Sequence, residues 1–148
     1  MQDITDEVTV NVPIALAWKA IQDPGEHVTW HPFASRIDGD HAPGAVRTCT
    51  VQLGRKPGTT RERCTSYDEA NMIMWTMEHD SSGFSRMVAD WQTGFRLTAQ
   101  GPGVTRVQAV SQFRPKGPVV RVMMPVIRRK FHKTQRAILD GLRQHAER

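Results

Sequence analysis

Apolar and polar residues alternate along the middle of the chain, as they do in strands that bury one face of a sheet. From Gly44 to Arg114 this period of two is interrupted by turn signals at "GRKPG", "DEAN", "HDSSG" and "GPG". The pattern predicts an antiparallel meander. The inward positions of its strands are Cys49, Val51, Leu53, Cys64, Ser66, Ile73, Trp75, Met77, Met87, Ala89, Trp91, Phe95, Leu97, Val107, Ala109 and Phe113.

Centring each turn on its glycine or polar cluster predicts the residues that face each other on neighbouring strands. The predicted pairs are Cys49 with Glu62, Cys64 with Trp75, Trp75 with Ala89, and Leu97 with Val107. The apolar positions then fall on one face throughout, whereas a slip of one residue would turn a strand's side chains to the other face. One face of the sheet is therefore expected to be buried.

The pattern of the N-terminal residues predicts a strand followed by two short helices. Residues 3 to 11 alternate as a strand does, and Pro13 opens a helix that runs through Ile21, because proline is tolerated in a first turn. A second helical turn over residues 25 to 30 leads to an extended segment after Pro32.

Two tryptophans in this part raise the question of what they face. Trp18 shares a helix face with Ile14, Ala17 and Ile21, and we expect it to anchor the core. Trp30 follows the second helical turn, and the sequence leaves open whether it belongs to the core or to a pocket wall.

The C-terminal stretch from residue 117 to 148 has the period of one long amphipathic helix. Its predicted apolar stripe is Val120, Met123, Ile127, Phe131, Ile138 and Leu142, opposite Arg121, Arg128, Arg129, Lys133 and Arg136. We expect this helix to cover the buried face of the sheet. Pro125 should kink it or delay its start, because proline removes a backbone donor and clashes with the preceding turn.

The order of these elements and four sequence stretches resemble the helix-grip superfamily of START domains, the birch-pollen allergen and polyketide cyclase/dehydrase-like proteins. The stretches are "VTVNVPIALAWKAIQDPGEHVTWHP", "GAVRTCTV", "RERCTSYDEANMIMWTM" and "GVTRVQAVSQFRPKG". The resemblance covers essentially the whole chain. It implies one α+β domain over residues 1 to 148, with a curved antiparallel sheet wrapped around a long C-terminal helix.

In this superfamily the space between sheet and helix often holds an apolar ligand, so the resemblance implies such a site here. We expect a small aromatic, polyketide-like or lipid ligand. The candidate ligand-binding residues are Trp30, Phe33, Arg47, Cys49, Val51, Glu62, Cys64, Ile73, Trp75, Met87, Trp91, Phe95, Met123 and Ile127.

Two charged residues occupy inward positions on the predicted sheet. Arg47 is expected opposite Cys64 and diagonal to Glu62, on the face that should be dry. Because an unpaired buried charge is costly, the two side chains should pair or reach the mouth of a cavity. The sequence leaves open whether they fix a hairpin or read a polar group of a ligand.

The charge is concentrated at the C-terminal end. The net charge is +5, yet residues 114 to 148 contain ten Lys and Arg against Asp140 and Glu147, a local balance of +8. The simplest interpretation is a solvated helix face; nucleic acid or an anionic membrane is the alternative partner. Without a signal peptide or an apolar run long enough to span a membrane, we expect a cytoplasmic protein with free thiols at Cys49 and Cys64.

Catalytic and metal motifs are scarce. His27 and His31 have the spacing of two ligands on one helix face, but a third ligand is not evident, so we expect neither a metal nor another cofactor. Tyr67, the only tyrosine, falls beside an acidic turn rather than at a catalytic position. Three functions stay open: binding of a small apolar ligand, a polyketide cyclase or aromatase reaction in the same cavity, and an interaction through the basic helix.

Overall fold

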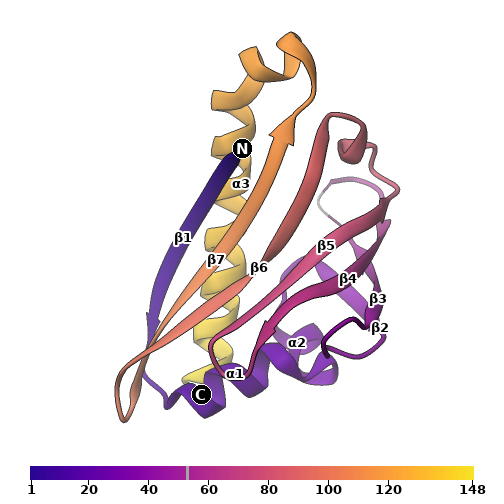
Figure 1. The fold of residues 1–148 in the computed structure, drawn as a ribbon. Helices are drawn as coiled ribbons and strands as arrows, with labels where there is room; N and C mark the ends of the chain where they lie inside the picture. The colour runs from indigo at the N-terminus through magenta and orange to yellow at the C-terminus, as the bar shows by residue number, and fades with distance from the viewer. Residues whose placement is uncertain (53) are drawn as a thin grey trace.

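Antiparallel pairing of neighbouring strands builds one curved sheet that folds around the long C-terminal helix (Figure 1). The computed structural model describes residues 1–52 and 54–148, so Leu53, one of the predicted inward residues, lies outside them. The sheet has seven strands in the order β1-β7-β6-β5-β4-β3-β2. The strands are β1 (Gln2–Val10), β2 (Ala34–Asp38), β3 (Val46–Val51), β4 (Gly58–Asp68), β5 (Met72–Asp80), β6 (Val88–Gly101) and β7 (Val104–Pro115).

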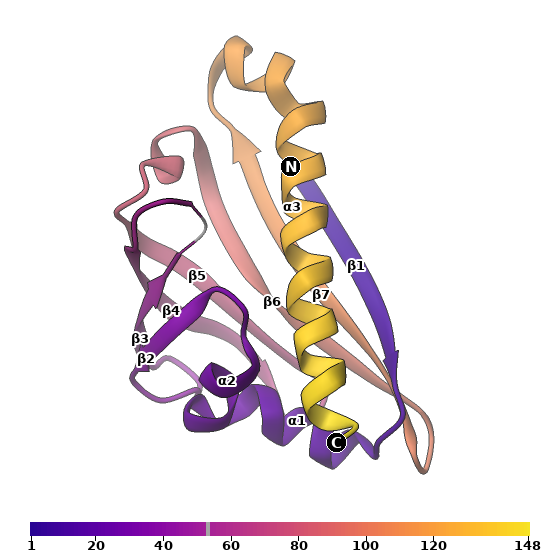
Figure 2. The same cartoon turned by 180° about the vertical axis from the view of Figure 1, so that it is seen from behind.

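The helices lie on the concave side of this sheet. They are α1 (Ile14–Gln22), α2 (Pro24–Trp30) and α3 (Gly117–Ala146), with a short 3-10 helix η1 (Phe84–Arg86) between β5 and β6. Figure 2 shows α3 running the length of the molecule, while α1 and α2 cross one end of it. This α+β arrangement is the helix-grip fold that the sequence predicts, with the two short helices placed after the first strand.

The meander has the predicted faces, but two of its four predicted strand pairs are displaced. Cys64 with Trp75 and Leu97 with Val107 are confirmed. The other two predictions are wrong, because Cys49 pairs with Thr60 and Trp75 pairs with Thr93. Each displacement is an even number of residues, so the side chains stay on the predicted side of the sheet. The β5–β6 error arises because η1 moves the centre of that turn beyond Ser82.

A β-bulge in β6 changes the inward pattern near its start. The register between β6 and β7 shifts by one residue between Ala89 and Gln92, and Asp90 has a φ of 54°. Val88 therefore faces the core and is 3% exposed, while the predicted inward residue Ala89 pairs with the exposed Arg114. Alternation alone does not reveal an added residue of this kind.

The long helix is continuous from Gly117 through Pro125, so the proline does not delay its start. The buried positions of α3 are Val120, Met124, Ile127, Gln135, Leu139 and Leu142. Met123 was predicted to face the core; it is instead 42% exposed, and Met124 takes the buried place. The prediction placed the residue after Val120 three positions later, at Met123, whereas the buried residue lies four positions later, at Met124. Hydrophobic periodicity distinguishes poorly between these two spacings.

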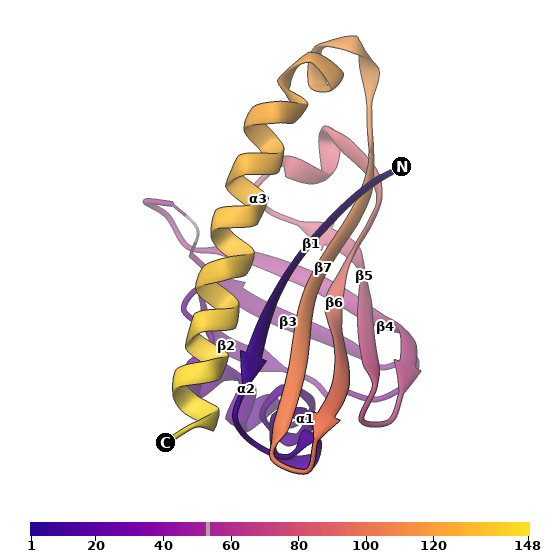
Figure 3. The same ribbon diagram turned by 90° about the vertical axis from the view of Figure 1, so that its left-hand side faces the viewer.

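A polar clamp holds α3 on the edge of the sheet. The Asp6 carboxylate in β1 accepts hydrogen bonds from the Gln135 amide (2.8 Å) and from Arg136 Nε (3.2 Å), and His132 Nδ1 lies 2.8 Å from it. Ser111 in β7 donates to the Gln135 amide oxygen at 2.7 Å. The clamp ties α3 to β1 and β7, the two strands that Figure 3 shows beside it.

The buried apolar residues form two clusters along the concave side. The larger one packs α1 and α2 against the sheet and includes Trp18, Trp30, Ile73, Trp75 and Phe95. The smaller one lies under the first half of α3. Its members are Ile4, Val88, Phe113, Val120, Met124 and Ile127, with Phe84, Met87, Trp91 and Phe131 packed against them. Within residues 1–52 and 54–148, no helix is both long and apolar enough to cross a bilayer.

The backbones of β5 and β6 lie very close to each other at Gly94. A Cβ atom at this position would collide with the Ile73 carbonyl oxygen and lie 2.7 Å from the Met74 Cα. Both atoms belong to backbone, which cannot move aside without disturbing the sheet.

We predict that Gly94→Ala lowers the free energy of unfolding by about 1 to 3 kcal/mol or more, as overpacking against fixed atoms does. Urea unfolding of the two proteins measures the difference. Gly103→Ala is the matched control, because a Cβ there meets nothing within 4 Å. Equal losses in the two variants would contradict the close approach.

Candidate functional site

A buried ion pair lies on the concave side of β3 and β4. Arg47 and Glu62 are 7% and 5% exposed, and they pair directly across the two strands rather than diagonally. Arg47 Nε and Nη2 donate to one Glu62 oxygen at 3.2 and 2.8 Å. Of the two outcomes that the sequence left open, a pair or a position at a cavity mouth, the structure shows the pair, and it lies in the interior.

The remaining faces of the Arg47 guanidinium are also occupied. Its Cζ atom lies 3.6 Å from the centroid of the Trp75 ring, a cation–π contact. Its Nη1 atom donates to His41 Nε2 at 2.8 Å, because an arginine is always protonated and the imidazole nitrogen must accept. His41 therefore carries its proton on Nδ1, which donates to the Ile21 carbonyl at 3.0 Å.

Two further histidines lie close to Arg47 and His41: His27 in α2 and His31, which directly follows α2. His27 Nδ1 donates to the same Ile21 carbonyl at 2.9 Å, and the ring stacks on Trp30 with centroids 4.7 Å apart. His31 Nδ1 accepts from the backbone N–H groups of Phe33 (3.1 Å) and Ala34 (3.0 Å). The neutral His31 ring consequently keeps its proton on Nε2, where it is a hydrogen-bond donor.

The environment keeps these imidazoles neutral. Burial, and next the Arg47 charge, lower the pKa values of His31 and His41 to about 4. The same two causes, in the same order, place the pKa of His27 well below 6.5. Burial alone would raise the pKa of Glu62, but the Arg47 charge and hydrogen bonds from Thr60 and Arg47 outweigh it and lower that pKa.

Two buried indole N–H groups find no acceptor among the described residues. They belong to Trp75 and Trp91, on the concave side of β5 and β6. The Trp75 side chain is in the larger cluster, and Trp91 contacts Phe84 of the smaller one with ring centroids 4.8 Å apart. Buried donors are nearly always paired in proteins, so each of these N–H groups points to an acceptor other than those that residues 1–52 and 54–148 supply.

The structure brings most of the predicted site residues to the concave side, in three groups. Around the ion pair lie Arg47, Cys49, Glu62, Cys64 and Trp75; Trp30, Ile73 and Phe95 belong to the larger cluster; Met87, Trp91 and Ile127 belong to the smaller one. Val51 and Phe33 are half-buried near the β2–β3 pair, and Met123 lies apart on the exposed side of α3.

In the sequence analysis, His27 and His31 were candidates for metal ligands, and His41 was not a candidate site residue. The spacing of His27, Trp30 and His31 by three and four residues indicates one helix face and could have suggested their stacking. His41 gives no such signal, because a loop delivers it to Arg47. Within the described residues, no group of three or more His, Cys, Asp or Glu side chains is arranged to hold a metal ion.

Neither cysteine is set up as a nucleophile. Cys49 and Cys64 are free thiols, as expected, and both are buried. Burial raises the pKa of Cys49 to about 11 and also raises that of Cys64. Because the thiolate is the reactive form, both side chains act as small apolar groups here.

Trp18 and Tyr67 lie together beyond the ion pair, at the end of the larger cluster. Trp18 is 5% exposed and its indole donates to Glu69 at 3.0 Å, so the predicted core role is confirmed. Tyr67 packs on its edge and also donates to Glu69. Burial, and next Glu69, raise the pKa of Tyr67 to about 12, so the phenol stays protonated.

Trp30 also has its polar group satisfied within the chain. Its indole donates to the Ala20 carbonyl at 2.8 Å, and the side chain is 6% exposed. Gly141 of α3 allows this close packing, because a Cβ there would lie 2.6 Å from the Trp30 carbonyl oxygen. His145 Nε2, one turn later, lies 2.9 Å from Glu26 of α2. Together these contacts fix α2, and with it His27 and His31, against the end of α3.

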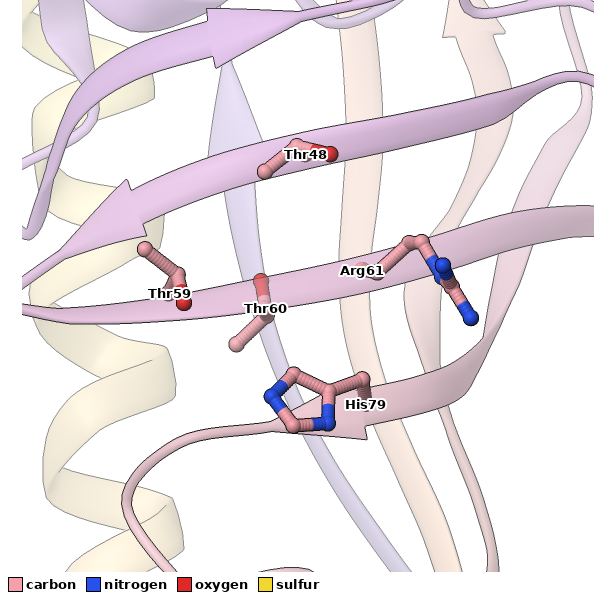
Figure 4. A pocket seen from close by; sticks show the side chains of 5 residues that line it. All are labelled: Thr48, Thr59, Thr60, Arg61 and His79. Atoms are coloured by element: carbon pink, nitrogen blue, oxygen red, sulfur yellow. The ribbon is translucent and has the colours of Figure 1, made fainter.

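A separate hollow of about 370 Å³ lies over β3 to β5 (Figure 4). It is lined by Thr48, Thr59, Thr60, Arg61 and His79. The exposed Thr48 and Arg61 pair across β3 and β4 and alternate with the buried Arg47 and Glu62, so the hollow lies on the convex face. Its side chains are three threonines, an arginine and a histidine, and Thr60 also donates to Glu62 of the ion pair.

Comparison with protein families identifies the family of the chain. The model of the family described as "Polyketide cyclase / dehydrase and lipid transport" matches residues 1–147. The chain belongs to this family. Comparison with curated protein sequences gave no significant match.

Solved structures of members of the same fold superimpose over almost the whole chain. The Zhui aromatase/cyclase from a Streptomyces species has 17% sequence identity and a TM-score of 0.79, covering 99% of this chain and 94% of that one. Norcoclaurine synthase from Thalictrum flavum, in complex with dopamine and hydroxybenzaldehyde, has 16% identity and a TM-score of 0.74, covering 97% and 84%. At such identities the likeness shows the shared fold.

We predict that removing one partner of the buried ion pair is far more costly than removing both. Arg47→Met leaves the Glu62 carboxylate buried without its partner and should cost about 3 to 5 kcal/mol of unfolding free energy. The double variant Arg47→Met/Glu62→Leu should recover a large part of that loss. Denaturant unfolding of the wild type, both single variants and the double variant gives the comparison; additive losses would contradict a direct pair.

We also predict that the histidines make the protein less stable in acid. With folded pKa values of about 4 against 6.5 for the free side chain, His31 and His41 bind protons in the unfolded chain first. Stability is therefore complete above about pH 6.5 and is lost as the pH falls toward about 4. Urea unfolding between these limits should show a shallower decline for His31→Asn and His41→Gln than for the wild type, and parallel curves would refute the assignment.

Proposed function

We propose that the protein binds a small, largely apolar aromatic molecule on the concave side of the sheet, with an acceptor oxygen of that molecule facing the buried indoles. The observation that carries this proposal is the pair of unpartnered N–H groups of Trp75 and Trp91. A ligand oxygen would provide the acceptor that each of them lacks.

The surroundings of Trp91 suit an aromatic body. Phe84, Trp91 and Phe131 form edge and tilted contacts with centroids 4.8 to 6.3 Å apart, and all three side chains are only partly buried. Flat rings that remain partly accessible on a concave face offer stacking surfaces to another ring. Met87 beside them adds an adaptable apolar contact.

The ion pair marks the polar end of the proposed site. Arg47, Glu62 and His41 satisfy one another and adjoin Trp75, so they present fixed dipoles rather than free charges to the interior. An uncharged acceptor, such as a ketone or ether oxygen, fits this environment better than a carboxylate, which would compete with Glu62 for Arg47. The family match and the aromatic compounds bound by the norcoclaurine synthase structure support the same class of ligand.

A cyclase-type reaction at the same place is the alternative that the aromatase/cyclase neighbour suggests. The groups nearest the indoles favour binding over proton transfer. Glu62 holds hydrogen bonds from Arg47 and Thr60 and has a lowered pKa, which makes it a weak base. The histidines are weak bases for the same reason, since their pKa values are also lowered.

We predict that the protein binds acetylnaphthalene, which carries one ketone acceptor, more tightly than ethylnaphthalene, which has the same shape without it. Trp75→Phe and Trp91→Phe each keep an aromatic ring and remove one N–H group. At least one of them should weaken acetylnaphthalene binding about three- to tenfold, the worth of a neutral hydrogen bond, and leave ethylnaphthalene binding unchanged. Isothermal titration calorimetry measures both.

Trp18→Phe is the matched control, because the Trp18 indole already donates to Glu69. It should leave both affinities as they are. If neither compound binds saturably, the proposed function fails. If both bind but the two substitutions affect them equally, the site exists and the assigned role of the indole N–H groups is wrong.

A further inference from the structure

The first turns of α3 expose an apolar ridge that no other element covers among the described residues. The ridge consists of Val119, Val122, Met123 and Val126, which are 70%, 80%, 42% and 55% exposed. Their spacing of three, four and seven residues puts them on one face of the helix. Figures 1 and 2 show this part of α3 standing beyond the end of β1.

A second, adjoining face of the same turns is apolar as well. This second face packs into the smaller cluster through Val120, Met124 and Ile127. The ridge residues are therefore not needed to anchor the helix to the core. A helix that is apolar on both sides normally has both sides covered. Since the protein core covers only one of these two faces, the ridge is suited to contact an apolar surface outside this chain.

The residues that follow the ridge and flank it are basic. Arg129, Lys130 and Lys133 continue the outward face of α3, and all three are exposed. No acidic residue occurs between positions 91 and 139 of the sequence. The partner of the ridge is therefore expected to carry negative charge around an apolar interior.

A groove lies at the same end of the molecule, on the side of α3 away from the ridge, between the start of α3 and the ends of β1 and β7. It has a volume of about 450 Å³ and is lined by Met1, Gln2, Arg114, Pro115, Arg121 and Met124. Arg114 pairs with Asp90 at 3.4 Å, and the groove is separate from the ridge.

We propose that this end of α3 docks on a lipid surface with anionic headgroups. The ridge enters the boundary of the acyl chains, and Arg129, Lys130 and Lys133, which continue the same face of the helix, contact headgroup phosphates. Apolar insertion beside a basic face is the usual way in which helices bind to the surface of membranes.

A second copy of the chain fits this surface less well. Two ridges in contact would bring their basic flanks together, which is unfavourable without an anion between them. The ridge is also a narrow, projecting helix face, whereas a stable dimer needs a broad complementary area. The proposal does not depend on the proposed function, because the ridge side chains are exposed, whereas other residues of the same helix, Met124 and Ile127, pack into the cluster that contains Trp91.

The test is co-sedimentation of the full chain with phosphatidylcholine vesicles and with vesicles of phosphatidylcholine and phosphatidylglycerol at a ratio of two to one. We expect binding to the anionic vesicles only, weakened by salt. Val122→Asn/Val126→Asn should reduce it at least tenfold without unfolding the protein, because both side chains are mostly exposed. Arg129→Gln/Lys130→Gln/Lys133→Gln should reduce it to a similar degree.

Matched controls separate the ridge from general surface effects. Leu16→Asn removes an apolar side chain that is 54% exposed on α1, at the other end of the molecule. Arg55→Gln/Lys56→Gln/Arg96→Gln lowers the net charge by the same amount at exposed positions elsewhere. Both control proteins should bind like the wild type.

Three results would overturn the proposal. The first is an absence of vesicle binding at low salt. The second is vesicle binding that Val122→Asn/Val126→Asn leaves intact, since that would reflect attraction of positive charge alone. The third is a dimer in light scattering that the same double substitution dissociates, because the ridge would then belong to a second copy.

Discussion

The arginine buried on β3 organises the interior of this protein. Arg47 cannot lose its proton, so every neighbour has to accommodate a positive charge away from water. Glu62 supplies the opposite charge, His41 a lone pair and Trp75 the face of a ring. Because these partners come from a loop and two neighbouring strands, one guanidinium holds β3, β4, β5 and the β2–β3 loop in fixed relation.

The other half of the fold is held by different means. The Asp6 clamp and Gly141 fix α3 against β1, β7 and α2, and these contacts lie along one side and one end of the grip. The strands that carry Arg47 are bound through their own network instead of through α3. The fold thus joins two regions held by different contacts. Of the indoles proposed to meet a ligand, Trp75 lies on β5, which Arg47 contacts, and Trp91 lies on the neighbouring β6.

Sequence reasoning predicted the order of the elements and the faces of the strands, because alternation survives errors of two or four residues in register. It placed Arg47 and Glu62 on the inward face of neighbouring strands and left open whether they pair or reach a cavity mouth, because alternation does not decide between these two ways to satisfy a buried charge. It could not place His41, which a loop brings from elsewhere, or the bulge at Asp90, which adds a residue without changing the local pattern. Met123 was misplaced because its helix has apolar residues on both sides, so periodicity there has no single answer.

The position of β1 has a consequence for how the chain folds. β1 pairs with β7 along its whole length, from Gln2 with Phe113 to Val10 with Thr105, and α3 then covers both. The hairpins of the meander can form from neighbours in sequence, whereas β1 must wait until β7 and the strands between them are present. Contacts between such distant segments slow folding. Until they form, Ile4 and Val10 stay in water beside an unpaired strand edge, and the newly made chain is at its most prone to aggregate.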